Sequence, residues 1–301
     1  MTDDELLPAP TMIARSLDRA RKGQLLYVGN DGEVRSPEAL RTRNVVAYGL
    51  VGGVTASGVV LAAMTFPPII PLYLALGGRF AASAHAIRRL NESSAALGRG
   101  EPEAARLSAE PVARAWWLPR HVRALAEIRV AAALALEGNA EAALTRLRQG
   151  RAKLAAKSVQ QRSSRFTEVH LLTQLGRLDE ARATLHELGD VPTGEVLRVA
   201  HWLAELHLAC AEGKHTLTEP ELHERARKGL AMTAGRDLLQ LCAWGYAQLG
   251  DREQVEFLLG EALDREGSSQ LEITMPSLAR WLASADFTPR RSSDDDAFKD
   301  L

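Results

Sequence analysis

The densest group of side chains that could do chemistry lies in "HWLAELHLACAEGKH", residues 201–215. It contains three histidines, a glutamate and a cysteine: His201, Glu205, His207, Cys210 and His215. Such residues could hold a zinc ion, which needs three or four converging ligands. On a helix, His201 and Glu205 share one face, whereas His207 and Cys210 share another. We therefore expect no metal site here and interpret the histidines as groups that pack between helices.

The sequence also lacks the motifs of common catalytic sites. It contains no GxxxxGKS/T, HExxH, GxSxG or CxxC. The glycine-rich stretch 49–58 lacks the lysine and the strand context of a phosphate-binding loop. Acidic residues are spread along predicted helix starts, where they stabilise the helix N-terminus. We therefore expect neither a catalytic site nor a cofactor.

Two adjacent tryptophans, Trp116 and Trp117, lie in "ARAWWLPRHVR" on a predicted connection between helices. Three arginines flank them: Arg114, Arg120 and Arg123. Tryptophan and arginine are enriched among the residues that anchor protein interfaces, so the pair is a candidate contact for a protein partner. The alternative, which we prefer, is that one ring packs into the neighbouring repeat while the other is half exposed.

The overall composition is that of a globular protein and excludes some partners. Of 301 residues, 46% are hydrophobic and 25% are charged, and the formal net charge is -1. Because there is no overall basic field and only 5% of residues are aromatic, we expect no nucleic-acid partner. The two cysteines, Cys210 and Cys242, form no spaced framework, which indicates buried reduced thiols in a cytoplasmic compartment.

One segment departs from this balance, because residues 44–78 carry no charge. Residues 45–66 are long enough to cross a bilayer, for which an α-helix needs about 20 apolar residues. Gly49, Gly53 and Ser57 recur every fourth residue, a pattern that lets membrane helices pack closely and could join copies of the chain. We expect residues 44–80 to insert into membrane lipid. The alternative is a buried helical hairpin or a self-association surface, and an oligomeric pore would lack polar lining residues.

Two topologies fit this hydrophobic segment. Three prolines, at 67, 68 and 71, end the first helix, and "IIPLYLALGG" could return the chain as a shorter second leg. Three arginines precede the segment and three follow it: Arg35, Arg41 and Arg43, then Arg79, Arg88 and Arg89. Equal numbers favour a hairpin with both ends in the cytoplasm over a single span. The Ala-, Arg- and Leu-rich composition is typical of a high-GC bacterium, so we expect the bacterial inner membrane.

The remaining sequence repeats itself. Similar segments begin at five glycines: Gly100, Gly138, Gly176, Gly213 and Gly250. The steps between them are 38, 38, 37 and 37 residues, and a helix-length segment precedes each of the last four. "GNAEAALTRLRQG" and "GRLDEARATLHEL" show the common unit, in which a glycine turn precedes an acidic helix start. This periodicity predicts helix–turn–helix units over residues 81–285.

These units resemble the tetratricopeptide repeat (TPR) family over roughly residues 82–285. The clearest copy, "WGYAQLGDREQVEFLLGEAL", has Tyr246 four residues before the turn and small residues at Ala243 and Ala262. Trp202 occupies another position of the family pattern. Three residues depart from that pattern: Glu127, Arg165 and Leu239. The period also exceeds the family's roughly 34 residues. The resemblance implies an all-α superhelix of about five repeats whose concave face binds a protein partner, and it implies no chemistry.

The sequence thus predicts four regions. Residues 1–43 form an N-terminal arm with a possible small β-hairpin, and residues 44–80 form the membrane segment. Residues 81–285 form the TPR-like domain in the cytoplasm, and residues 286–301 form a disordered charged tail. We expect a membrane-anchored scaffold that recruits a protein through its repeats. The alternative is a soluble repeat-containing regulatory protein whose apolar segment is buried or mediates self-association.

Overall fold

The structure, a computed structural model, describes residues 70–156, 158–189, 191–192, 194–232, 235–264 and 270–287. These residues form twelve helices and no strand, so this part of the chain is all-α, as the sequence predicts. The expected arm (1–43), most of the expected membrane segment and the tail from residue 288 lie outside the described residues. Among the helices that the structure describes, none combines the length and the apolar character needed to cross a bilayer.

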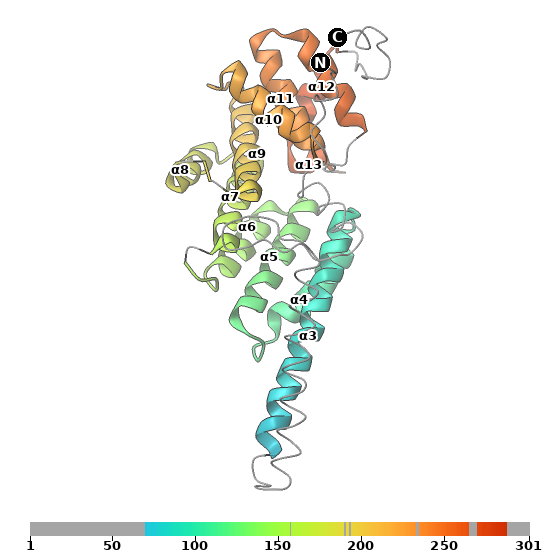
Figure 1. The fold of residues 1–301 in the computed structure, drawn as a ribbon, viewed down its shortest axis with the longest axis vertical. Coiled ribbons are helices and arrows are strands. Elements are labelled where there is room, and N and C mark those ends of the chain that lie inside the picture. Colours follow the sequence, from blue (N-terminus) through green and yellow to red (C-terminus); the bar gives the residue numbers. More distant parts are fainter. Residues whose placement is uncertain are drawn as a thin grey trace, which may run out of the picture.

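Ten of the described helices form five consecutive pairs (Figure 1). The pairs are α3 (Ile70–Gly98) with α4 (Pro102–Arg114), α5 (Arg120–Leu136) with α6 (Ala140–Arg151), α7 (Val159–Gln174) with α8 (Leu178–Leu188), α9 (Glu195–Glu212) with α10 (Glu219–Leu230), and α11 (Arg236–Leu249) with α12 (Arg252–Leu263). Each pair is joined by a turn that contains one of the five repeating glycines, whose φ values are 73°, 81°, 72°, 75° and 79°. Glycine adopts this left-handed conformation without a steric penalty, so the spacing of the glycines sets the spacing of the helix pairs.

Small apolar side chains hold the first helices together. Ala96 of α3, Ala105 of α4 and Ala133 of α5 are buried in one cluster near the Gly100 turn. Toward the other end of the same helices, Ala86 of α3 shares a cluster with Leu118, which lies in the connection between α4 and α5. The order of these contacts shows that α3 and α4 run antiparallel and that the α4–α5 connection lies level with the middle of α3.

Helix α3 is the longest element, with 29 residues. It runs without a break through the expected boundary between residues 80 and 81, so the uncharged residues 70–78 and the first repeat helix belong to one element. Residues 70–81 continue beyond the α4–α5 connection, by about 18 Å at a rise of 1.5 Å per residue. Figure 1 shows this end of α3 projecting from the helical array.

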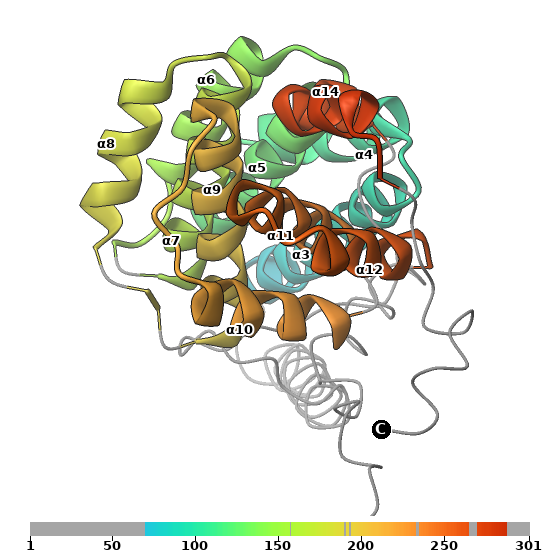
Figure 2. The ribbon, with the colours of Figure 1, turned by 90° about the horizontal axis from the view of Figure 1, so that it is seen from above.

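Successive pairs pack side by side into a curved array, as the view from above shows (Figure 2). The largest core lies around α9 and α11, where Trp202, Leu206, Leu239 and Tyr246 are buried together. Two short helices, α13 (Leu271–Thr274) and α14 (Pro276–Ser284), follow the last pair. Helix α14 packs against α9 and α11, whereas α13 reaches back to α5.

Candidate functional site

The first candidates from the sequence, His201 and Glu205, belong to a polar cluster between α9 and α10. The Nε2 atom of His201 lies 3.8 Å from the carboxylate of Glu205, and Arg225 of α10 lies 2.9 Å from the same carboxylate. The Arg225 guanidinium also lies over the Trp202 ring, 5.7 Å from its centroid. Burial lowers the pKa of His201, so its imidazole is neutral at pH 7. The cluster therefore ties one helix of the pair to the other.

His207, the next candidate, pairs with a histidine of the preceding repeat. Its Nδ1 atom lies 2.9 Å from Nδ1 of His170, and the two rings stack with their centroids 5.1 Å apart. Burial lowers the pKa of His170 to about 4 and that of His207 well below its ordinary value. Both rings are thus neutral at pH 7, and one Nδ1–H donates to the other ring. Their separation of 37 residues equals one repeat step, which is the signal by which the sequence could have revealed the pair.

His215 and the cysteines have structural surroundings. The Nε2–H of His215 donates to the Gly245 carbonyl at 3.0 Å, while its Nδ1 accepts from the Leu217 amide at 3.1 Å. Cys210 and Cys242 are both buried and free, and burial raises the pKa of each thiol to about 12, which keeps it protonated and unreactive. Within the described residues, no three His, Cys, Asp or Glu side chains gather as metal ligands would.

The tryptophan pair is exposed. Trp116 is 81% exposed and Trp117 is 45% exposed, whereas Leu118 beside them is buried. The preferred interpretation, in which one ring packs into the neighbouring repeat and the other is half exposed, is wrong: Trp117 is about half exposed, but Trp116 lies almost entirely in solvent. The pair is therefore available to an outside surface. The other expected contact residues, Gly49, Gly53 and Ser57, lie outside the described residues.

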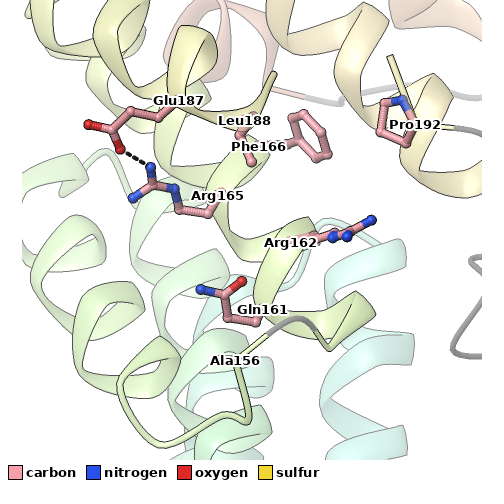
Figure 3. Close-up of a pocket in the computed structure, with 8 residues that line it drawn as sticks. All are labelled: Ala156, Gln161, Arg162, Arg165, Phe166, Glu187, Leu188 and Pro192. Carbon is pink, nitrogen blue, oxygen red and sulfur yellow. Dashed lines mark hydrogen bonds and ion pairs between the residues drawn. The ribbon is translucent and has the colours of Figure 1, made fainter. Parts of the chain in front are cut away.

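A hollow lies beside α7 on the described surface (Figure 3). Its volume is about 630 Å³, which is within the range of pockets that accept small molecules or a few side chains. Helix α7 provides one wall, the end of α8 provides another, and two connections complete the rim. The lining residues are Ala156, Gln161, Arg162, Arg165, Phe166, Glu187, Leu188 and Pro192.

The hollow has a charged side and an apolar side (Figure 3). Arg165 of α7 forms an ion pair with Glu187 of α8 at one end of the hollow. The exposed Arg162 side chain forms no hydrogen bond or ion pair with any described residue, so its charge remains available. Phe166 borders the apolar side but is only 2% exposed, and its ring packs edge-on against His201 with centroids 5.6 Å apart. An available cation at the rim of the hollow suits a peptide that carries a carboxylate.

The sequence does contain a signal for this region. Residues 142–167 include seven lysines and arginines and no acidic residue, although the net charge of the whole chain is only -1. Two buried glutamates from the flanking helices compensate part of this charge: Glu127 bonds Arg146 at 3.0 Å and Lys153 at 2.9 Å, and Glu168 bonds Arg148 at 2.7 Å. Arg162 lies at the end of the stretch without such a partner among the described residues.

Neither a protein-family model, nor a curated protein, nor a solved structure matches this chain. The features of this molecule that bear on its function are the repeating helix pairs, the protruding α3, the exposed tryptophans and the hollow beside α7.

Proposed function

We propose that this chain is a membrane-anchored scaffold whose TPR-like helical repeats bind a protein partner. The observation that carries the proposal is the succession of five helix pairs whose glycine turns recur at steps of 38, 38, 37 and 37 residues. Arrays of this kind present extended surfaces to segments of other proteins. The histidines and cysteines that could have indicated chemistry are engaged in packing, which favours a binding role.

The course of α3 supports the membrane anchor. Its first nine residues, 70–78, belong to the uncharged stretch that begins at residue 44. The same helix then continues into the first core, where Ala86 and Leu90 are buried. A bilayer segment attached to α3 would thus be connected to the repeats by continuous helix rather than by a flexible linker. In this proposal the repeats lie in the cytoplasm of a bacterium, at its inner membrane.

The anchor is tested by fractionating cells that contain the full chain or a variant without residues 44–78. The deletion ends before Ala86, the first buried residue of α3 that the structure describes, so the packed part of the repeats is retained. We expect the full chain to stay in the membrane pellet after an alkaline carbonate wash and the variant to become soluble and helical. A variant without residues 1–43 serves as the control and should stay in the pellet. A full chain that is soluble without detergent would instead support the soluble regulatory protein.

The hollow beside α7 is the part of the repeats that we propose as a partner contact. A photo-crosslinking residue in place of Arg162 should capture a protein in cells, whereas the same residue in place of Arg227 should not. Arg227 is the matched control, because it is exposed on α10 and its side chain also has no hydrogen bond or ion pair with a described residue.

With the captured protein purified, Arg162→Glu should weaken its binding about tenfold or more, since a hydrogen bond to a charged group contributes about 1.5–3 kcal/mol. Arg227→Glu should leave the affinity unchanged. Equal capture at the two positions, or equal affinities of the two variants, would exclude the hollow as the contact.

A further inference from the structure

We propose that Trp116 and Trp117, with the arginines around them, form a contact with the headgroup layer of an anionic lipid bilayer. The proposal rests on the membrane anchor proposed above and specifies how the repeat domain is held against that membrane. It assigns the tryptophan pair to lipid rather than to the protein partner.

The position of the pair along α3 is the first argument. Leu118 shares a core cluster with Ala86, so the α4–α5 connection lies level with the middle of α3. Arg79 is exposed and is the first charged residue after the uncharged stretch. From Arg79 to Ala86 the helix rises about 10 Å, at 1.5 Å per residue. If the apolar core of a bilayer ends near Arg79, its headgroup layer extends about 5–8 Å further, so the connection lies at the outer edge of that layer and the tryptophan side chains are within reach of the headgroups.

The chemistry of the exposed side chains is the second argument. Two exposed tryptophan rings place apolar surface in contact with water, which is unfavourable unless another surface covers them. The connection that carries them is held in place by the next residue, Leu118, which is buried. The indole ring combines an apolar body with one N–H donor. For this reason tryptophan is enriched where bilayer and water meet, with its ring at the level of the headgroups.

The charge around the pair is the third argument. Residues 111–126 contain three arginines and a histidine and no acidic residue. Arg114 is compensated, because it bonds Glu110 at 2.6 Å. Arg120 donates only to a neutral carbonyl, that of Ala152, at 3.0 Å, which joins this connection to the one between α6 and α7. No described acidic residue pairs with Arg79, Arg120 or Arg123. Uncompensated cations around exposed indoles complement anionic headgroups.

The test uses the full chain reconstituted into vesicles of phosphatidylcholine and phosphatidylglycerol, with and without bromine on the acyl chains. Bromine quenches only tryptophans that reach the bilayer. Of the five tryptophans, Trp202 and Trp244 are buried. We expect brominated lipid to remove about two fifths of the emission, the share of Trp116 and Trp117 among five equal emitters. The double variant Trp116→Phe/Trp117→Phe should lose this quenching, whereas Trp281→Phe should keep it.

Flotation of the same vesicles after an alkaline carbonate wash reports on the anchor separately. A chain that floats but whose tryptophans are quenched by aqueous acrylamide and not by bromine would overturn the lipid contact and leave the anchor intact. Shielding from acrylamide without bromine quenching would also overturn it, since a protein or a second copy would then cover the pair. A chain that does not float, yet shows bromine quenching before the wash, would refute the anchor and retain the lipid contact. The absence of both signals would refute both proposals.

Discussion

Gly150 lies where α6 approaches α5 most closely, and its replacement by alanine should destabilise the repeat domain. A Cβ atom at this position would lie 2.9 Å from the Cβ of Glu127 and 3.0 Å from the carbonyl oxygen of Ala124. Neither atom can move alone. The Ala124 carbonyl belongs to the α5 backbone, and the Glu127 carboxylate is held by Arg146 and Lys153. The two helices would therefore have to move apart.

The magnitude follows from two opposing effects. Inserting a methyl group into a packed interior costs about 1–3 kcal/mol. Exchanging glycine for alanine inside a helix gains up to about 1 kcal/mol, and less near a helix end. Gly150 is the penultimate residue of α6, so the gain is small. We expect Gly150→Ala to lower the free energy of unfolding by about 1–2 kcal/mol.

The assay is urea unfolding of the full chain in a mild non-ionic detergent, followed by far-UV circular dichroism. The urea midpoint should fall while the slope of the transition stays unchanged, because the surface exposed on unfolding is the same. Gly78→Ala is the control, since Gly78 lies in α3 and its added Cβ would meet no atom within 4 Å. This control should not lower the midpoint. A Gly150→Ala midpoint equal to or above that of the natural chain would refute the close-packing argument.

Variants at three further places are tested by the same assay: two places lie between repeats and the third is the turn between α7 and α8. Glu168→Gln should cost about 2–3 kcal/mol, because it removes a buried carboxylate that two arginines of α6 bind; an unchanged midpoint would contradict this. Burial alone would raise the pKa of Glu168, but the hydrogen bonds from these arginines lower it overall, so its contribution is complete at neutral pH and the difference should shrink in acid as the carboxylate is protonated. The pKa of His170 falls from 6.5 to about 4, so the unfolded chain takes up protons first and stability should decline as the pH falls from 6.5 towards 4. Replacing both His170 and His207 by leucine should flatten that decline, and an equally steep decline in the double variant would show that other groups cause it. Gly176→Ala should cost about 1 kcal/mol through its φ of 72°, since no neighbour lies within 4 Å, and Gly176→Asn should cost less; equal midpoints for the two variants would argue against a backbone origin.

The spacing of the helix pairs was predictable because it depends on a local requirement. A turn with positive φ favours glycine, so turns that recur every 37 or 38 residues leave glycines at the same spacing in the sequence. The continuity of α3 was not visible. The sequence predicted a boundary between residues 80 and 81, just after Gly77 and Gly78, whereas the structure continues the helix through these residues. Two glycines cost a helix about 2 kcal/mol at most, which the residues on either side can offset.

The proposed binding surfaces depend on contacts between distant segments and were less predictable. The hollow exists because the first turn of α7 lies beside the end of α8 and the connections that flank them. The sequence shows only the excess of positive charge over residues 142–167. For the tryptophan pair, the sequence led us to expect that one of the two rings packs, whereas the structure exposes both Trp116 and Trp117. Exposure is decided by the direction that a connection takes, and in this connection Leu118 occupies the core position.

The return of α13 to the middle of the array changes the mechanics of the whole domain. The Nε2 of Gln174 donates to the carbonyl of Ile273 at 2.7 Å, across 99 residues of sequence, and Ile273 lies against the Gly138 turn. In an open array each unit touches only its neighbours, so an end can fray while the rest persists. Here α13 connects the C-terminal end of the array to the second and third helix pairs. A force applied to the C-terminal end is thereby transmitted to the middle of the array. The array should therefore resist stretching more than an array of the same length without this contact.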